Sequence, residues 1–472
     1  MNRRASILIA VLVALVLTAL TGLSVSAMAD GQRAATGTAM ERTRLRSLAW
    51  SGAMVVLERV QQQRTQLLQG GRPDVPEVLL EVESGGLILT SKLLPLDEDG
   101  TLLAAENARL DARHAPREVL LKIEGLGDSD ADRIISLRAA GPKALENAFL
   151  RGELSPQRRS LNPASETEVV RSRDTGFADW FTFLNFEPAV QRGSGTQQPG
   201  IARVVYPRTI SEELREALRE RLGDTAVAAM IAMESAKKVP STRAELFAGL
   251  SNAGETTDNI AAALDLFRFS TDPYEAGLVN VNEAPARVLM CLPGIDASRA
   301  EGIVSARSAS DVSVRMHPTW LLTSGCLTPA QFRAVVPYVT TRSLQWRVRI
   351  GVHAARLDEV NPSVDSSSVG TSIILEVIID ASGTRARIAS IRDITYEGVP
   401  LLPPQVIDKV INEPDDVPVE PPAGFPNAPM KSEPKARVVP SPARGQRQPP
   451  DTPPRRSPAP PRDVRTGRWR AS

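Results

Sequence analysis

The sequence predicts an α+β fold with a long N-terminal helix, a small antiparallel sheet and a large helical domain inserted into the sheet. Three observations predict it: an apolar run that leads into an apolar stripe of helical spacing, short β patterns on both sides of a helical block, and an internal repeat inside that block. The chain has 472 residues, 42% of them hydrophobic, which is enough for two or three domain cores.

The first expected element is a long helix over residues 1–70. Ala5–Leu23 is an uncharged apolar run of 19 residues. As a helix it spans about 28 Å, close to the ~30 Å hydrocarbon core of a membrane. Two arginines precede the run, which predicts a single transmembrane anchor with most of the chain outside the cytoplasm. The alternative is a cleaved secretory signal that ends at Ala29, because small residues precede Asp30.

The helix is expected to continue beyond this run. Within Arg44–Val60, apolar or small residues recur every three or four positions, as on one face of a helix. Gly70–Gly71 and Pro73 then end the pattern. Gly31 and Gly37 weaken the connection between the apolar run and this stripe.

The strands of the sheet are expected in two separated regions. In residues 71–107, Glu77–Glu83 and Leu87–Leu93 read as two strands joined by a Ser-Gly-Gly turn. In residues 341–411, three further strand patterns follow, at Trp346–Val352, Thr371–Asp380 and Arg385–Ile394. Residues 108–340 between them read as helical, and residues 412–472 as a disordered Pro/Arg-rich tail that holds 16 of the 37 prolines.

Composition excludes several classes of protein. The formal net charge is only +1, so the whole chain is not a basic nucleic-acid binder. Two cysteines and three histidines exclude a disulfide-dense scaffold, a Cys-rich zinc protein and a His-rich metal centre. No Ser-His-Asp set, Walker loop or HExxH motif occurs, so the chain is not expected to be an enzyme and requires no cofactor. Asp97–Gly100 is a weak candidate for a Ca²⁺ loop, and a solvated turn is the better interpretation.

The helical block contains a repeat with an offset of 169 residues. Ala115–Arg138 and Ala284–Arg307 share ten identities over 24 positions. Each copy reads as a helix, a glycine turn at Gly125 or Gly294, and a second helix, which resembles a helix–hairpin–helix motif. Such motifs bind nucleic-acid phosphates through backbone N–H groups at a helix N-terminus. Acidic residues dominate both turns, so a packing role is favoured over DNA binding.

Two smaller features leave alternatives open. Cys291 and Cys326 can form a disulfide, or Cys291 can be a buried thiol. Five of the 19 aromatic residues lie within Phe177–Phe186, and Phe177, Trp180, Phe181 and Leu184 share a helical face, which indicates either core packing or a partner-binding patch.

The segment around the second repeat carries a family resemblance. Residues 278–289, with the sequence LVNVNEAPARVL, followed by Leu292-Pro293-Gly294-Ile295, resemble the K-type minor pseudopilin of type II secretion (general secretion pathway protein K). The matched positions are Asn280, Asn282, Ala284, Pro285, Leu289, Pro293, Gly294, Ala300 and Arg307. The N-terminal run, the segment Arg46–Gly52 and Thr340–Ser343 before a strand are similar as well.

The resemblance implies a pilin-like sheet, an inserted helical domain and no catalysis. It places the chain in the inner membrane, with most of its residues in the periplasm, at the tip of a pseudopilus. The implied partners are other minor pseudopilins and the inner-membrane secretion machinery. Prepilin peptidase would cleave between Ala5 and Ser6, although glycine usually precedes that bond, so cleavage there, cleavage after Ala29 and no cleavage all stay open. Pseudopilins often bind calcium in loops beside the sheet, which makes Glu359–Ser368 a second weak candidate for a Ca²⁺ site.

Two functions from different classes remain. The first is a non-enzymatic minor pseudopilin that assists protein secretion across the outer membrane. The alternative is an anchored or exported DNA-binding module built on the two helix–hairpin–helix units. Because basic residues are not concentrated at either turn, nucleic acid is the less favoured partner.

Overall fold

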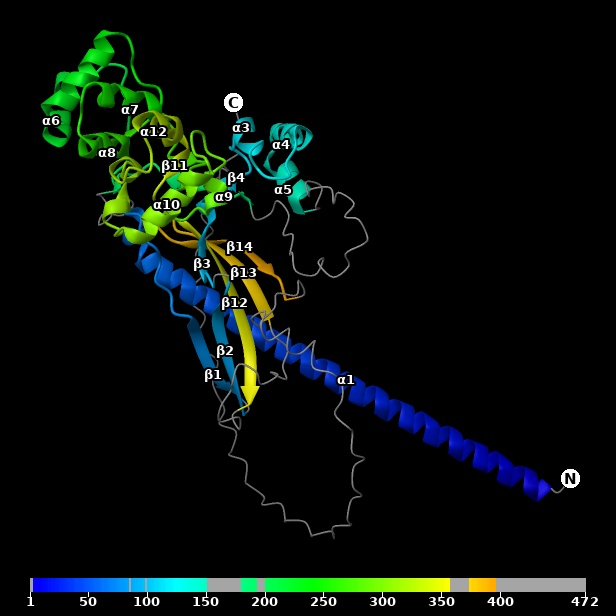
Figure 1. Ribbon diagram of the computed structural model, residues 1–472. Helices are drawn as coiled ribbons and strands as arrows, with labels where there is room; N and C mark the ends of the chain where they lie inside the picture. Colours follow the sequence, from blue (N-terminus) through cyan, green and yellow to red (C-terminus); the bar gives the residue numbers. More distant parts are fainter. Residues whose placement is uncertain are drawn as a thin grey trace, which may run out of the picture. The chain divides into compact units, whose positions relative to one another are not determined.

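One uninterrupted helix, α1 (Arg3–Gln62), forms the N-terminal region of the computed structural model (Figure 1). The structure describes residues 3–84, 86–97, 100–150, 180–192, 200–356 and 373–395. All of these belong to one of two compact units, residues 1–403. The expected tail (412–472) and the Ca²⁺ candidate Glu359–Ser368 lie outside the described residues, as do two residues of the other Ca²⁺ candidate. Gly31 and Gly37 do not break α1, although the sequence indicated a loose connection there.

The C-terminal half of α1 packs on a sheet. The predicted apolar stripe supplies the contact, and its buried members recur every three or four residues: Leu45, Leu48, Ala49, Ala53, Val56 and Val60. At Gly52 the helix comes so near the sheet that an added Cβ would lie 3.2 Å from Leu79 and 3.3 Å from Ile350. The short helix α2 (Arg64–Leu68) follows, and Gly70, with a φ of +93°, ends it as predicted.

The N-terminal half of α1 does not have the transmembrane character that the sequence predicted. From Leu15 onward its side chains are exposed, and Asp30, Arg33 and Glu41 interrupt the apolar residues that follow the initial run. Across the described residues, no helix combines the length and the apolar character that crossing a membrane requires. The expectation of a single-pass helix in the inner membrane is therefore wrong.

Six of the described strands form the main antiparallel sheet, in the order β1-β2-β12-β13-β14 with β3 pairing to β12 (Figure 1). Five of these six strands are confirmed predictions from the sequence, each within a few residues, and β3 was not predicted. Their bounds are β1 (Val78–Ser84), β2 (Leu87–Leu94), β3 (Leu103–Ala105), β12 (Gln345–Arg356), β13 (Ile373–Asp380) and β14 (Arg387–Asp393). A small antiparallel sheet is thus built from two regions that are far apart in the sequence.

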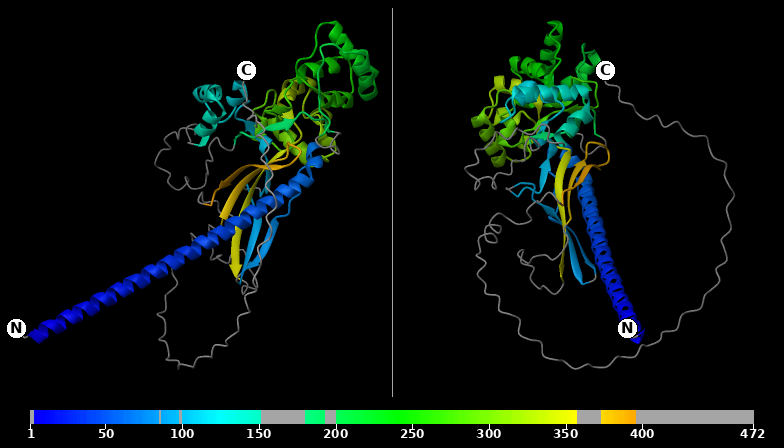
Figure 2. Two further views of the ribbon diagram at one scale, coloured as in Figure 1. Left: turned by 180° about the vertical axis from the view of Figure 1, so that it is seen from behind. Right: turned by 90° about the vertical axis from the view of Figure 1, so that its right-hand side faces the viewer.

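The long central strand β12 carries the core under α1. Its alternate residues Trp346, Val348, Ile350 and Val352 are buried together with the stripe of α1. Both views of Figure 2 show α1 running along one face of the sheet. Burial of this apolar surface is the main force that holds the helix on the sheet.

The region between β3 and β12 is mostly helical, as expected, but not wholly. Its helices are α3 (Arg117–Leu120), α4 (Asp128–Ala140), α5 (Pro142–Leu150), α6 (Glu212–Ser235), α7 (Arg243–Asn252), α8 (Thr257–Leu266), α9 (Ala286–Leu289), α10 (Ala297–Ala309), α11 (Trp320–Thr323) and α12 (Pro329–Val335). Short strands interrupt them in pairs: β4 (Leu110–Asp111) with β5 (Phe181–Thr182), β6 (Phe186–Pro188) with β9 (Tyr274–Ala276), β7 (Val204–Val205) with β8 (Phe267–Arg268), and β10 (Val279–Asn280) with β11 (Val339–Thr340).

This region has its own core, separate from the core under α1. Trp320, Phe332 and Phe247 are buried in it, the last two with ring centroids 4.9 Å apart. Phe181 also lies in this core, which agrees with the packing interpretation of the aromatic cluster. The predicted helical face for that cluster is wrong over the described residues, because β5 and β6 are extended there.

Candidate functional site

The two copies of the repeat fold in the same way. In each, a strand of two residues leads through a short helix and a glycine turn into a helix of 13 residues: β4, α3 and α4 in the first copy, β10, α9 and α10 in the second. Gly125 and Gly294 occupy the turns with φ values of +79° and +76°, which glycine tolerates best. The strand of each copy pairs in parallel with a distant strand, β5 or β11.

An arginine holds each copy together at equivalent positions. Arg138 donates from Nε to the carbonyl of Ala112 and from Nη1 to that of Ala115, both at 2.7 Å. Arg307 donates from Nη1 to the equivalent carbonyls, at 3.3 Å for Val281 and 2.6 Å for Ala284. The identity Arg138/Arg307 in the sequence therefore reflects one shared structural role: the arginine ties the second helix to the start of the first.

The asparagines of the second copy connect it to the start of the sheet. Asn280 accepts the backbone N–H of Asn282 at 2.9 Å and donates to Ser343 Oγ at 2.7 Å. Asn282 donates to the carbonyls of Arg315 at 3.0 Å and Thr341 at 3.2 Å. Because Thr341 and Ser343 lie just before β12, these bonds fix the repeat to the strand that carries the sheet core.

The other motif residues have packing roles. Ala284, Leu289 and Ala300 are buried, Pro285 precedes the first residue of α9, and Pro293 leads into the turn at Gly294. Each of these roles stabilises the fold of the unit.

The remaining candidates do not gather into one site. Cys291 and Cys326 are both free thiols, Cys291 is buried, and burial raises its pKa to about 11. Ala5 and Ser6 lie in the first turns of α1, far along the chain from the motif. No group of His, Cys, Asp and Glu residues in the described ranges could hold a metal ion.

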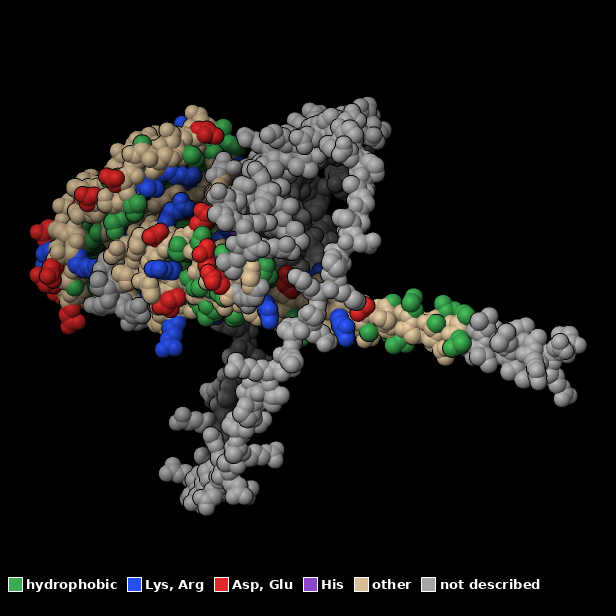
Figure 3. Space-filling model, turned by 90° about the horizontal axis from the view of Figure 1, so that it is seen from below, with side chains coloured by type: hydrophobic (Ala, Val, Ile, Leu, Met, Phe, Trp, Pro, Cys, Tyr) green, Lys and Arg blue, Asp and Glu red, His purple; other side chains and the backbone are tan. Residues whose placement is uncertain are grey.

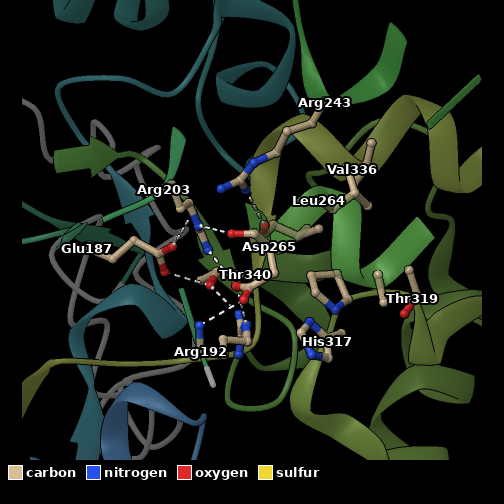
Figure 4. A pocket seen from close by; sticks show the side chains of 13 residues that line it. Glu187, Arg192, Arg203, Arg243, Leu264, Asp265, His317, Thr319, Val336 and Thr340 are labelled. Atoms are coloured by element: carbon tan, nitrogen blue, oxygen red, sulfur yellow. Dashed lines mark hydrogen bonds and ion pairs between the residues drawn. The ribbon is translucent and has the colours of Figure 1, made fainter. Parts of the chain in front are cut away.

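A buried charge network lies next to the motif, because Thr340 of the network pairs with Asn280, and sequence reasoning missed it. Figure 4 shows part of it, with Glu187, Arg203 and Thr340. Glu187 Oε1 accepts from Arg342 Nη2 at 3.0 Å and from Arg203 Nη1 at 3.3 Å, and Oε2 accepts from Thr340 at 2.7 Å. Arg203 also donates to Glu275 at 2.8 Å, and all these side chains are buried or nearly so. Arginines with several carboxylate partners can remain charged at such depth.

The network joins the helical region to the sheet. The Arg342 side chain also donates to the carbonyls of Val190 and Pro188, at 3.0 and 2.8 Å, and its own carbonyl accepts from Asn107 at 2.8 Å. Asn107 lies in the turn after β3, whereas Arg342 lies between β11 and β12. The two chain crossings between the sheet and the helical region are therefore bonded to each other.

Burial shapes the protonation of this network. Burial alone would raise the pKa of Glu187, but Arg342 and Arg203 outweigh it and hold that pKa well below its usual range. Asp265 behaves in the same way beside Arg203 and Arg192. Burial and the nearby Arg192 lower the pKa of His317 to about 4, so His317 is neutral at pH 7.

The cavity beside the network is too small for a substrate. Its walls include Arg192, Arg243, Asp265 and His317, and its volume of about 20 Å³ is space for about one water molecule. Small-molecule pockets are usually larger by more than tenfold, roughly 300–1,000 Å³. This cavity therefore leaves no room for a substrate beside the network, whose bonds form a structural junction.

An exposed apolar surface lies on α1. Figure 3 shows hydrophobic side chains gathered along the described N-terminal half of this helix. They are Leu15, Val16, Leu17, Leu20, Leu23, Val25 and Met28, and Leu20 alone is 60% exposed. We call these residues the α1 apolar end. A continuous apolar surface of this kind is typical of a contact site for another molecule.

No model of a known protein family matches the chain, and no curated protein matches it.

Proposed function

We propose that the chain is a non-enzymatic assembly subunit, a minor pseudopilin of the K type in type II secretion. In this proposal the sheet is the pilin-like domain (residues 71–107 and 341–411), and residues 108–340 are an inserted helical domain with two helix–hairpin–helix units. The α1 apolar end packs against the N-terminal helices of other minor pseudopilins at the tip of a pseudopilus.

One observation carries the proposal: a single helix has a buried apolar stripe from Leu45 to Val60 and an exposed apolar segment from Leu15 to Met28. An exposed apolar helix gains stability only when another surface covers it. Ala27, Ala34, Ala35 and Ala39 along this half are small, which lets a second helix approach closely.

The junction network supports the same proposal. A subunit at the tip of an assembly must present its helical domain in a fixed orientation to whatever lies above it. The bonds among Glu187, Arg203 and Arg342, together with those of Asn107 and Asn280, tie the helical domain to the sheet at both chain crossings. In our proposal the resemblance motif serves this rigid connection.

Two contacts weigh against the DNA-binding alternative. At the first turn the carboxylate of Asp130 accepts the backbone N–H of Gly127 at 3.2 Å. At the second turn Asp296 accepts the N–H of Arg299 at 2.9 Å. These carboxylates occupy the helix N-termini where a phosphate would bind, and their charge repels it.

The proposal is tested in cells that carry a type II secretion system and lack their own copy of this subunit. The double variant Leu17→Asp/Leu20→Asp should lose co-purification with the other minor pseudopilins and lose secretion, because charges enter the α1 apolar end. The matched control Val312→Asp/Val314→Asp alters two exposed apolar residues of the helical region instead and should retain both. Full association and secretion by the α1 variant would contradict the proposal.

A further inference from the structure

The two outer strands of the sheet carry opposite charge. Figure 1 shows β1 and β14 at opposite edges. Strand β1 contains Glu81 and Glu83, follows Glu77, and has no basic residue. Strand β14 contains Arg387 and Arg392 and follows Arg385. Within the chain, Arg387 pairs with Asp380 at 2.9 Å and Arg392 with Glu376 at 3.5 Å, and both arginine side chains remain more than half exposed. The one acidic residue of the strand, Asp393, is paired with Arg46 of α1.

Both edges are free to accept another strand. Along the described chain, nothing pairs with the outer side of β1 or β14. Val82 on β1 and Ile391 on β14 are both large apolar residues, 43% and 41% exposed. A sheet edge of this kind holds unpaired backbone N–H and C=O groups that can extend the sheet into a second molecule.

We propose that two copies of this chain join edge to edge, with β1 of one copy beside β14 of the next. With α1 of both copies on the same face of the joined sheet, only one direction is possible for this pairing. Four antiparallel steps separate β1 from β14, so the two strands run the same way within one copy. When the sheet of one copy continues into the next, they pair in parallel.

The register follows from the two strands themselves. Each has seven residues, and each has its irregular pairing near its first residues, between Val78 and Leu80 in β1 and opposite Ile378/Ile379 in β14. Alignment of the strands end to end therefore sets their regular parts side by side. Val82 then lies opposite Ile391, and Glu83 lies opposite Arg392.

The faces of the sheet agree with this register. Ile391 lies opposite Val377, which is buried in the core under α1. Leu80 lies opposite Ser91, which lies opposite Val352 of the same core, and Val82 is two residues further along the same face. The apolar pair therefore shares the α1 face, and Glu83 and Arg392 share the other face.

Charge also selects which edges meet. Pairing β1 with β1 would bring Glu81 and Glu83 of two copies together, and pairing β14 with β14 would do the same with the arginines. Like charges on neighbouring strands oppose pairing, and opposite charges favour it. The contact is therefore between different surfaces of the two copies, which generates a ring or an open chain rather than a closed twofold dimer. This inference does not rest on the proposed function.

The test is disulfide cross-linking of the full chain between two single-cysteine edges. The background variant is Cys326→Ser, which removes the more accessible thiol, whereas Cys291 is buried and is retained. A mild detergent is added to cover the α1 apolar end. The Val82→Cys chain and the Ile391→Cys chain, one of them with a larger tag, are each oxidised alone and are also oxidised together as a mixture. We expect a cross-linked dimer only in the mixture. Glu81→Cys, on the other face, replaces Val82→Cys as the control and should cross-link less with Ile391→Cys.

Charge exchange then separates pairing from misfolding. Glu83→Lys on the Val82→Cys chain, or Arg392→Glu on the Ile391→Cys chain, should lower the yield of dimer about threefold, the effect of one cross-strand charge pair. Mixing the two charge-exchanged chains should restore it. Cross-linking of Val82→Cys alone, no dimer in the mixture, cross-links only to a different protein, or no restoration would each overturn the proposal.

Discussion

The two halves of α1 belong to one helix but have opposite environments. From Leu45 to Val60 the helix presents a stripe of small and apolar residues to the sheet, and the stripe is buried. From Leu15 to Met28 it is apolar as well, yet its side chains are exposed. Apolar composition therefore does not by itself indicate a core: the stripe from Leu45 to Val60 is stabilised within the chain, whereas the segment from Leu15 to Met28 is covered by another molecule only in our proposal.

The largest expected difference between the halves is the change in stability when a charged residue is introduced. Val56→Asp should lower the free energy of unfolding by about 4 kcal/mol or more, because an unpaired carboxylate enters the core under α1. Leu20→Asp should leave that free energy unchanged within about 0.5 kcal/mol, because Leu20 is exposed. Urea unfolding of the two variants and the wild type provides the measurement. Equal destabilisation by both would contradict the account of α1.

Acid should destabilise the charged junction more than the apolar contact between α1 and the sheet. His317 is buried as the neutral form with a pKa of about 4, so protonation favours the unfolded chain, where the pKa is about 6.5. Stability should therefore fall by up to about 3 kcal/mol as the pH drops from 6.5 to 4. The lowered pKa of Glu187 adds a further loss of stability below pH 4.5, because this carboxylate binds a proton more readily in the unfolded chain than in the folded one.

Hydrogen exchange and denaturant unfolding measure this acid effect. His317→Asn should show a smaller loss between pH 6.5 and 4.5 than the wild type does. Amides of α1 from Leu45 to Val60 should remain protected at a pH where those beside the junction exchange faster. An unchanged pH dependence in His317→Asn would remove the histidine from the account.

Glycine positions in the two halves offer a matched pair. Gly52→Ala should cost about 1–2 kcal/mol, since the new methyl group meets Ser91, Leu79 and Ile350 and outweighs the higher helix propensity of alanine. Gly22→Ala adds a methyl group to a position with nothing within 4 Å, so stability should not fall. Thermal unfolding distinguishes the two variants, and a stable Gly52→Ala variant would show that the helix is less closely packed than described.

The smallest expected effect concerns ion pairs on the two halves. Arg46 donates to Asp393 at 2.6 Å where α1 leaves the sheet, and Arg33 lies 3.6 Å from Asp30 in the exposed half. Arg46→Gln should cost less than about 1 kcal/mol, because its side chain is largely exposed. Arg33→Gln should have no measurable effect on unfolding, and a larger loss there would mean that the exposed half contributes to the folded core.

The sequence predicted those elements whose cause is local. The helical spacing in Arg44–Val60, the turn at Gly70 and the alternation along β12 each gave the observed element, because periodicity and glycine reflect backbone geometry directly. The repeat also predicted matching units, and the shared roles of Arg138 and Arg307 explain why. The prediction of a membrane-spanning segment was wrong for the described residues.

The junction was beyond sequence reasoning for a physical reason. Glu187, Arg203 and Arg342 come from segments up to 155 residues apart, and no spacing connects them. In the sequence each one reads as an ordinary charged surface residue, although burial and mutual pairing define their roles. Short strands such as β10 and β11 were missed for a different reason: two residues are too few for a periodic pattern.

Photo-cross-linking from α1 tests the central claim most directly. A photoreactive amino acid at Leu20 and, in a second variant, at Val312 of the helical region would be activated in cells that carry a type II secretion system. The account predicts cross-links from Leu20 to other minor pseudopilins and none to them from Val312. Absence of such cross-links from Leu20, with the variant expressed and folded, would contradict the claim that the α1 apolar end is an assembly surface.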